Sequence, residues 1–141
     1  MSSPDAASSP DVASADRDEP TLKVGEVAER VRLSHRTVRY YDDEGLLTAA
    51  RSAGNYRLYA ERDVERLLLI RVLKPLGYTL EEMRELLHLV ASLEDPDHRP
   101  TDREREELET FTVDVKRRRD RLAEQLAAAD DFYASLEGRL G

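Results

Sequence analysis

The most constraining feature of this sequence is a pair of short amphipathic segments near its N-terminal end, separated by only two residues. Apolar side chains recur at helical spacing from Val24 to Val31, which predicts a short helix over residues 24–32 with one buried face. Leu33 and Ser34 interrupt this pattern, and Ser34 can accept a backbone N–H as the N-cap of a second helix. Two short helices joined by a tight turn are typical of a helix-turn-helix motif, whose second helix enters the major groove of DNA.

The second predicted helix carries side chains suited to reading DNA. In a helix-turn-helix, the first turn of this helix reaches the base edges. An arginine can pair with guanine or with a phosphate, and a tyrosine hydroxyl can bond a phosphate oxygen. We expect Val38 and Tyr41 on the buried side of the helix. The candidate DNA-binding residues of this segment are Ser34, His35, Arg36, Thr37, Arg39, Tyr40 and Tyr41.

A β-hairpin is predicted directly after the second helix, which ends at Gly45. Gly54 and Asn55 form a turn pair, and the residues from Tyr56 to Tyr59 alternate in the manner of a strand. A hairpin of this composition would form a basic wing beside the recognition helix. Its candidate DNA-binding residues are Arg51, Asn55, Tyr56 and Arg57.

Five sequence motifs occur in order between residues 22 and 87. They are Lys23-Val-Gly-Glu-Val-Ala-Glu-Arg, Thr37-Val-Arg-Tyr-Tyr, Glu44-Gly-Leu-Leu, Gly54-Asn-Tyr-Arg-Leu-Tyr and Leu76-Gly-Tyr-Thr-Leu-Glu-Glu-Met. In content and separation, this series resembles the MerR family of bacterial transcriptional regulators. The resemblance implies a mostly α fold, in which an N-terminal winged helix-turn-helix with a small β-hairpin wing is followed by a long C-terminal dimerisation helix.

The resemblance also implies a function. Members of that family typically bind promoters with an unusually long spacer, and they bend and untwist the duplex to activate transcription. We therefore expect a homodimer that binds an inverted-repeat operator in double-stranded promoter DNA, with RNA polymerase as a partner at the promoter. No cofactor is expected. The alternative is an architectural DNA-bending protein of the excisionase sort, and a coiled-coil adaptor that no longer binds DNA is a third possibility.

Two further helices are predicted after the wing. Residues 60–74 present a broad apolar face, and Pro75 ends this helix because proline lacks a backbone donor. Thr79 and Glu82 have the spacing of a capping box, which starts a second helix that continues to about Ser92. Paired helices of this kind are expected to build the core.

The C-terminal part of the chain is predicted to be one long helix that carries an apolar seam. Apolar residues recur in steps of three and four, which is the pattern of a coiled coil, with Arg118 or Arg119 interrupting the series. Acidic residues at the start of this helix and a basic run at 116–119 favour an antiparallel pair of helices from two chains. The alternative is a helix that folds back within one chain. The candidate dimerisation residues are Leu108, Phe111, Val115, Leu122, Leu126, Ala129, Phe132 and Leu136.

Composition divides the chain into four parts. The first 20 residues are mainly Ser, Ala, Asp and Pro and bury too little surface to offset their ordering entropy, so we expect an acidic, disordered tail. The expected boundaries are 1–20 for this tail, 21–92 for the winged helix-turn-helix domain, 93–100 for a linker loop and 101–137 for the coiled-coil helix.

The net charge of −8 is unevenly distributed along the chain. Residues 1–20 carry −4, residues 21–80 carry +3 and residues 81–141 carry −7. The one net-positive part therefore contains the helix-turn-helix signature. Because phosphate attraction acts over only about 10 Å at moderate salt, a basic face on an acidic protein can still bind DNA.

Several other chemistries are disfavoured. The absence of cysteine excludes disulfides, thiolate-bound metals and iron–sulfur clusters. His98 and the acids of the loop at 94–100 lack the convergent geometry of a metal site, and no constellation of catalytic groups indicates an enzyme. No apolar run is long enough to cross a bilayer and no signal pattern is found, so a cytoplasmic protein is expected. A small-molecule site would have to lie between residues 83–92 and the start of the long helix, or in a pocket shared across the dimer.

Overall fold

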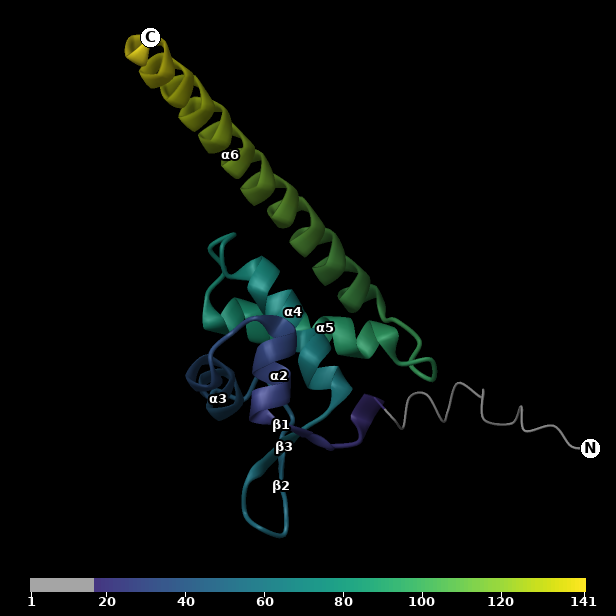
Figure 1. Cartoon of the computed structure of the whole chain (residues 1–141). Helices are drawn as coiled ribbons and strands as arrows, with labels where there is room; N and C mark the ends of the chain where they lie inside the picture. Colours follow the sequence, from purple (N-terminus) through teal and green to yellow (C-terminus); the bar gives the residue numbers. More distant parts are fainter. Residues whose placement is uncertain (1–16) are drawn as a thin grey trace, which may run out of the picture. The chain divides into compact units, whose positions relative to one another are not determined.

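The computed structural model describes residues 17–141, which fall into two compact units that divide between residues 72 and 73. The chain is mostly helical, as predicted (Figure 1). Most of the predicted disordered tail, residues 1–16, lies outside the described residues. Arg17 and Asp18 are described, and their side chains pair with Glu65 and Arg62 of helix α4 (Glu61–Leu73). The elements are β1 (Leu22–Lys23), α2 (Val24–Val31), α3 (His35–Asp43), β2 (Ala50–Arg51), β3 (Arg57–Tyr59), α4 (Glu61–Leu73), α5 (Leu80–Glu94) and α6 (Asp102–Leu140).

The turn between α2 and α3 confirms the predicted helix-turn-helix. Arg32 ends α2 in the left-handed conformation, with φ 58°, and the Leu33 N–H then bonds to the Ala28 carbonyl at 3.1 Å. The Ser34 hydroxyl accepts the Thr37 N–H at 3.0 Å, which makes it the N-cap of α3, as expected. The connection of three residues, 32–34, fixes the angle at which α3 leaves α2.

The core of the first unit is formed by the buried faces of its helices and by the strand that follows the wing. Its fully buried side chains come from α2, α3, β3, α4 and the loop after α3, so packing on several other parts of this unit sets the position of the recognition helix. Burial of side chains of this size stabilises the fold by about 1.5–3 kcal/mol each. The largest apolar side chains among them are Val27, Val31, Val38, Leu46, Tyr59, Leu67 and Ile70.

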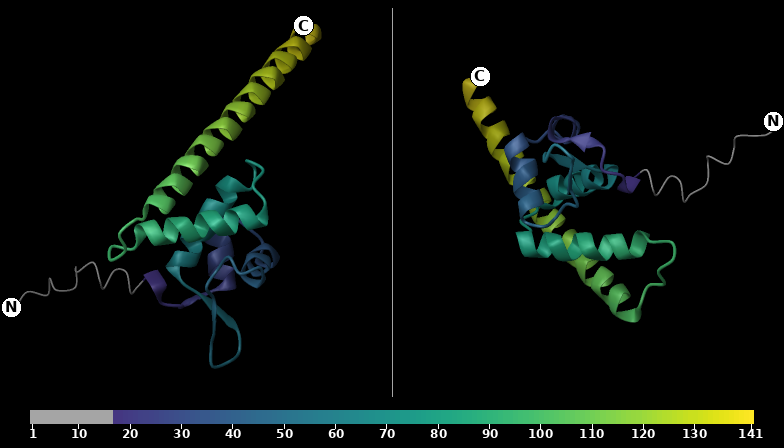
Figure 2. Two further views of the ribbon diagram at one scale, coloured as in Figure 1. Left: turned by 180° about the vertical axis from the view of Figure 1, so that it is seen from behind. Right: turned by 90° about the horizontal axis from the view of Figure 1, so that it is seen from below.

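The wing belongs to a three-stranded antiparallel sheet with the order β1-β3-β2. Arg51 pairs with Arg57 across the predicted hairpin, and Lys23 of β1 pairs with Leu58 on the other edge of β3. The hairpin was predicted from the sequence, but β1 was not, because two residues carry no alternation pattern. The consequence is that the segment preceding α2 is fastened to the wing (Figure 2).

The second unit consists mainly of α5 and α6, which are joined by the loop at residues 95–101. Two capping boxes are present: Thr79 and Glu82 start α5, as predicted, and Thr101 and Glu104 start α6. The α5 helix buries Met83, Leu86, Leu87 and Leu89. The α6 helix is uninterrupted for 39 residues and reaches Leu140, slightly beyond the predicted end at 137 (Figure 2).

The two halves of α6 differ in their surroundings. In the first half several side chains, including Phe111, Asp114 and Val115, are half-buried against the rest of the second unit. From residue 121 to the end of the chain every residue is exposed, although this segment carries Leu126 and Phe132. The second half of α6 therefore presents apolar side chains that this chain leaves uncovered.

Candidate nucleic-acid interface

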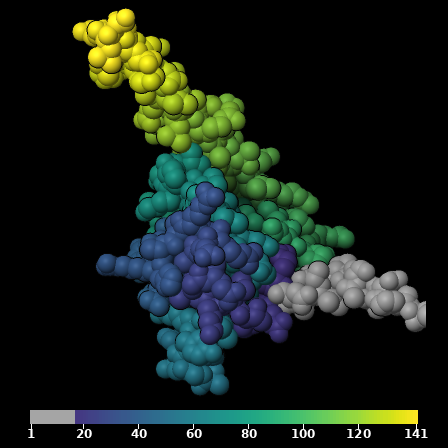
Figure 3. All heavy atoms as spheres, in the orientation of Figure 1, coloured from purple at the N-terminus to yellow at the C-terminus, as the bar shows by residue number. Residues whose placement is uncertain are grey.

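The exposed face of α3 carries most of the predicted DNA-reading side chains. His35, Arg36, Arg39 and Tyr40 are exposed, and Thr37 is half-buried. The alternation with buried Val38 places these polar groups on one side of the helix. In the space-filling view the α3 region and the wing form separate projections of the first unit (Figure 3). This is the arrangement that a groove-reading helix with a flanking wing requires.

Two of the predicted contacts on α3 are structural. Tyr41 has only 6% of its surface exposed, and burial raises the pKa of its hydroxyl. Its ring lies edge-on to that of Tyr40, with the centroids 5.3 Å apart. The Ser34 hydroxyl donates to Thr37 Oγ1 at 2.9 Å while accepting the Thr37 N–H. We therefore correct the predicted role of Tyr41 to a core residue, and we assign the Ser34 side chain to capping.

The tip of the wing displays Arg51, Asn55 and Tyr56, all of them exposed. Asn55 adopts a left-handed conformation with φ 65°, which asparagine tolerates better than most residues. A Cβ on Gly54 would lie 2.8 Å from Tyr56 Cε1, so glycine is needed at this position if the Tyr56 ring is to stay where it is. Arg51 Nη1 donates to the Asn55 carbonyl at 3.3 Å, which holds the arginine along the hairpin.

Arg57 links the wing to α3, and its predicted contact with DNA stays a prediction. Its guanidinium lies 2.6 Å from Asp43 Oδ1 and 3.3 Å from Asp42 Oδ2, and it also donates to the Arg39 carbonyl at 3.4 Å. Burial raises the pKa of Asp42, and the charge of Arg57 acts against that shift. Arg57 is therefore paired with two carboxylates of α3 while it also lines the basic cavity beside the wing.

Sequence reasoning missed Lys23, which lies beside the wing because β1 pairs with β3. Its Nζ is 5.3 Å from the centroid of the Tyr56 ring, within the range of a cation–π contact. A cavity of about 450 Å³ opens here, and no carboxylate lines it. Its lining residues are Lys23, Val24, Arg39, Arg51, Tyr56 and Arg57. This concentration of positive charge suits an anionic group such as a DNA phosphate.

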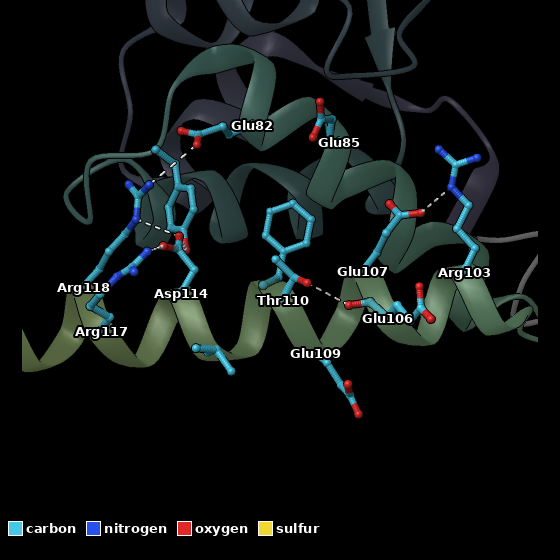
Figure 4. Close-up of a pocket in the computed structure, with 13 residues that line it drawn as sticks. Glu82, Glu85, Arg103, Glu106, Glu107, Glu109, Thr110, Asp114, Arg117 and Arg118 are labelled. Carbon is cyan, nitrogen blue, oxygen red and sulfur yellow. Dashed lines mark hydrogen bonds and ion pairs between the residues drawn. The ribbon is translucent and has the colours of Figure 1, made fainter.

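A second hollow lies within the second unit, between α5 and α6, where the sequence placed a possible small-molecule site. It measures about 990 Å³. Phe111 is one of the residues that line this groove. Figure 4 shows the Arg103–Glu107 ion pair toward one end of it. At the other end Arg118 contacts Asp114 at 2.8 Å and Glu82 at 3.6 Å. Arg118 thus breaks the apolar series of α6 because it binds polar groups of its own unit.

The candidate dimerisation residues divide along α6. Phe111 and Val115 are half-buried, whereas the other six, Leu108, Leu122, Leu126, Ala129, Phe132 and Leu136, are exposed. In the loop before α6, His98 Nε2 lies 2.6 Å from Glu104 Oε1. Within residues 17–141, no group of three or more His, Asp or Glu side chains has the arrangement of a metal site, and no helix is long and apolar enough to cross a membrane.

The chain matches two models of one family of known proteins. The model described as MerR HTH family regulatory protein matches residues 22–89, and the model described as MerR, DNA binding matches residues 64–138. Together they span the winged helix-turn-helix and nearly all of α6.

Characterised relatives and solved structures agree with this match. The chain is 40% identical over 81 residues to the HTH-type transcriptional regulator HmrR of Rhizobium leguminosarum, covering 57% of this chain and 60% of HmrR. It is 30% identical over 132 residues to the HTH-type transcriptional regulator YfmP of Bacillus subtilis, covering 85% of this chain and 91% of YfmP. The crystal structure of HiNmlR, a MerR family regulator lacking the sensor domain and bound to promoter DNA, matches with a TM-score of 0.62 and 26% identity, covering 82% of this chain and 87% of HiNmlR. From the winged helix-turn-helix, the long C-terminal helix and these matches, we conclude that the chain belongs to the MerR family of helix-turn-helix regulatory proteins.

Proposed function

We propose that this protein is a homodimeric transcriptional regulator that binds an inverted-repeat operator in promoter DNA and distorts it to control transcription. The observation that carries the proposal is the exposed face of α3, where Arg36 and Arg39 stand beside Tyr40 and make no side-chain ion pair within residues 17–141. Arginines that are not neutralised within the fold remain free to pair with guanine or with phosphate.

The wing supplies the second part of the surface. Lys23 and Arg51 lie in the basic cavity with Tyr56, and this cavity is also lined by Arg39 of α3. We expect α3 to provide base readout and the cavity to hold the DNA backbone, because backbone contacts fix the register at which base contacts form. A DNA complex is reported for HiNmlR, which has this fold.

Dimerisation follows from the uncovered half of α6. Leu126 is 63% exposed and Phe132 is 65% exposed, on a helix about 58 Å long. A second copy of the helix would cover these side chains, as in a coiled coil. Two DNA-reading surfaces related by a two-fold axis would then match an inverted repeat, whose half-site spacing depends on the dimer.

The charges along α6 favour an antiparallel orientation of the two helices. Glu106 and Glu109 make no ion pair within residues 17–141, so they are available to a partner helix. The basic run is less available, because Lys116 and Arg117 pair with Asp120 and Asp114 of the same helix. Such exposed pairs contribute only about 0.3–0.5 kcal/mol each, which a partner's carboxylates can outcompete.

The function is tested by incubating the purified full chain with fragmented DNA of its own genome and sequencing the retained duplexes. We expect fragments from promoters that share one inverted repeat, and we expect RNA polymerase to start transcription at a changed rate when the protein is added. Retention of fragments that lie away from promoters, with bending but no effect on transcription, would instead favour the architectural alternative. Retention of no fragment at low ionic strength would contradict DNA binding altogether.

A further inference from the structure

One buried carboxylate contacts both ends of the wing. Within residues 17–141, Asp63 near the start of α4 is the one polar or charged residue that is buried, with none of its surface exposed. Its Oδ1 accepts the Thr48 N–H at 2.7 Å and the Thr48 hydroxyl at 3.0 Å. Its Oδ2 accepts the Ala60 N–H at 2.9 Å. Residue 48 precedes β2 and residue 60 follows β3, so the whole wing leaves and re-enters the core at this single side chain.

Helix capping accounts for only one of these three hydrogen bonds. The bond from the Ala60 N–H to the carboxylate three residues later is the reciprocal half of a capping box at the start of α4. That bond requires one oxygen. The other oxygen is directed to Thr48, which is 15 residues away and lies outside α4. A capping function alone does not require this second contact.

Burial makes this arrangement demanding. A carboxylate without water is costly unless hydrogen bonds satisfy it, and Asp63 obtains three such bonds, all of them from Thr48 and Ala60. The N–H groups of Thr48 and Ala60 each point in one fixed direction. The carboxylate therefore keeps its hydrogen bonds only while the two ends of the wing stay in place. The position of the wing and the solvation of Asp63 are therefore coupled.

We infer that Asp63 is a positioning residue for DNA binding, which acts by fixing the direction in which the wing leaves the core. The inference rests on the proposed function, because the position of the wing affects function only if the wing contacts DNA. The second contact, from Arg57 to Asp42 and Asp43, holds the returning strand β3 against α3. Asp63 acts at the base of the wing. By fixing the direction of the wing, it places Arg51 beside Lys23 in the basic cavity.

The substitution Asp63→Asn separates these contacts with little change in size. An asparagine side chain offers one acceptor oxygen, and its NH₂ group would face a backbone N–H, so one end of the wing must lose its partner. Thr48→Val is a milder change, because it removes only the hydroxyl donor and leaves both backbone bonds. Leu67→Ala is a matched control: it destabilises α4 at a fully buried position without removing any hydrogen bond to the wing.

The first experiment needs no DNA. Trypsin cleavage after Arg51 is followed in the full-length variants under conditions where circular dichroism shows each to be folded. We expect cleavage about tenfold faster in Asp63→Asn than in Leu67→Ala, with Thr48→Val between Asp63→Asn and the wild type, because local opening controls proteolysis of folded chains. Should Asp63→Asn fail to fold, Thr48→Val is compared with the wild type alone. Equal cleavage in Thr48→Val and the wild type, or in Asp63→Asn and Leu67→Ala, overturns the inference.

The second experiment is a double-mutant cycle with Arg51→Ala on a 30-base-pair duplex that the wild type selects from a random pool. If Asp63 acts through the wing, Asp63→Asn lowers affinity about tenfold and reduces the slope of log affinity against log salt by about one, and adding Arg51→Ala causes little further loss. Losses that multiply independently contradict the inference. A wild type that selects no duplex contradicts the proposed function instead, while the proteolysis comparison still decides the role of Asp63.

Discussion

The guanidinium carbon of Arg118 lies 3.8 Å from the centroid of the Tyr78 ring, so a charged residue of α6 covers the aromatic residue that precedes α5. The Tyr78 hydroxyl donates to Asp114 at 2.7 Å, and Arg118 donates to the Leu76 carbonyl at 3.3 Å. This cluster fastens the first half of α6 to the connection before α5. The remainder of α6 is left free for a partner.

Tyr78→Phe is expected to destabilise the protein by about 1 kcal/mol. The substitution removes the hydrogen bond to Asp114 but keeps the ring beneath Arg118, so only the contribution of the hydroxyl is lost. Urea unfolding followed by circular dichroism measures the change. Tyr133→Phe is the control, since that side chain is 62% exposed and its loss is expected to be close to zero. Equal effects of the two substitutions would contradict the importance of the cluster.

The same hydroxyl makes stability depend on pH at the alkaline end. Burial, together with the bond to Asp114, raises the pKa of Tyr78 to about 12 from an ordinary value of 10.0. Between these two values the folded chain keeps a proton that the unfolded chain has lost, so stability falls as pH rises from 10 to 12. Tyr78→Phe should show a smaller fall over this range. A pH dependence identical to that of the wild type would argue against this assignment.

Asp114 makes stability depend on pH at the acid end, in the opposite direction: its contribution is lost as pH falls. The bond from Tyr78, followed by those from Arg117 and Arg118, lowers the pKa of Asp114 below its ordinary value of 3.8. Its stabilising contribution is complete above that value and disappears as pH falls through the lowered pKa. Asp114→Asn should therefore be less stable than the wild type at pH 6, and the difference should shrink toward pH 2 in the same unfolding assay.

A substitution at Arg32, in the turn of the helix-turn-helix, is expected to increase the stability of the first unit. Arg32 has φ 58°, a conformation that side chains with a Cβ adopt at a cost, and it ends α2. Arg32→Gly should stabilise the first unit by about 0.5–1 kcal/mol, measured as a rise in thermal midpoint. Asn55→Gly in the wing, at φ 65°, should give a smaller change because asparagine already tolerates this region. A loss of stability in Arg32→Gly would count against backbone strain at this turn.

We expect Arg36 to contact bases and Lys23 to contact the DNA backbone, so substitutions of the two residues should affect DNA binding differently. Arg36→Ala is expected to cost about 1–3 kcal/mol on the selected operator and little on random DNA, because it removes a base contact. Lys23→Ala should weaken binding to both kinds of DNA alike and lower the salt slope by about 1, because it removes a phosphate contact. Fluorescence anisotropy at several salt concentrations distinguishes the two patterns, and identical profiles for the two variants would reverse the assignments.

The parts of the fold that sequence could predict are those encoded locally. Ser34 and Thr79 cap helices through neighbours three residues away, so the starts of α3 and α5 were predictable. The strand β1 was missed because it exists only through pairing with β3, 35 or more residues later. Lys23 was missed with it, since nothing in its local sequence places it beside Tyr56.

The roles of individual site residues were harder to predict than their location. Arg57 stands in a basic wing, but its charge meets Asp42 and Asp43 from α3, and only the folded chain brings these carboxylates within reach. Tyr41 lies between a predicted buried face and a predicted DNA-binding face, and packing decides for the former. Burial thus gives Tyr41 a structural role, and long-range ion pairing gives Arg57 contacts within the protein that its local sequence does not predict.

The proposed dimer is tested by substitutions in the apolar series of α6. Val115→Glu combined with Leu122→Glu places charges in the apolar series, and we expect this variant to be monomeric by light scattering and to lose cooperative operator binding. Glu124→Lys, on the fully exposed segment outside the series, is the control and should leave the mass unchanged. A wild type that is monomeric at micromolar concentration would contradict the proposed assembly.

The most direct measurement is a footprint of the purified wild-type protein on a duplex that it has selected. Two copies of the exposed α3 surface, related by a two-fold axis, should protect two equivalent half-sites in inverted orientation, and the Val115→Glu, Leu122→Glu variant should lose both protections together. A single protected site, two sites in direct orientation, or protection that persists unchanged in the monomeric variant would contradict the account.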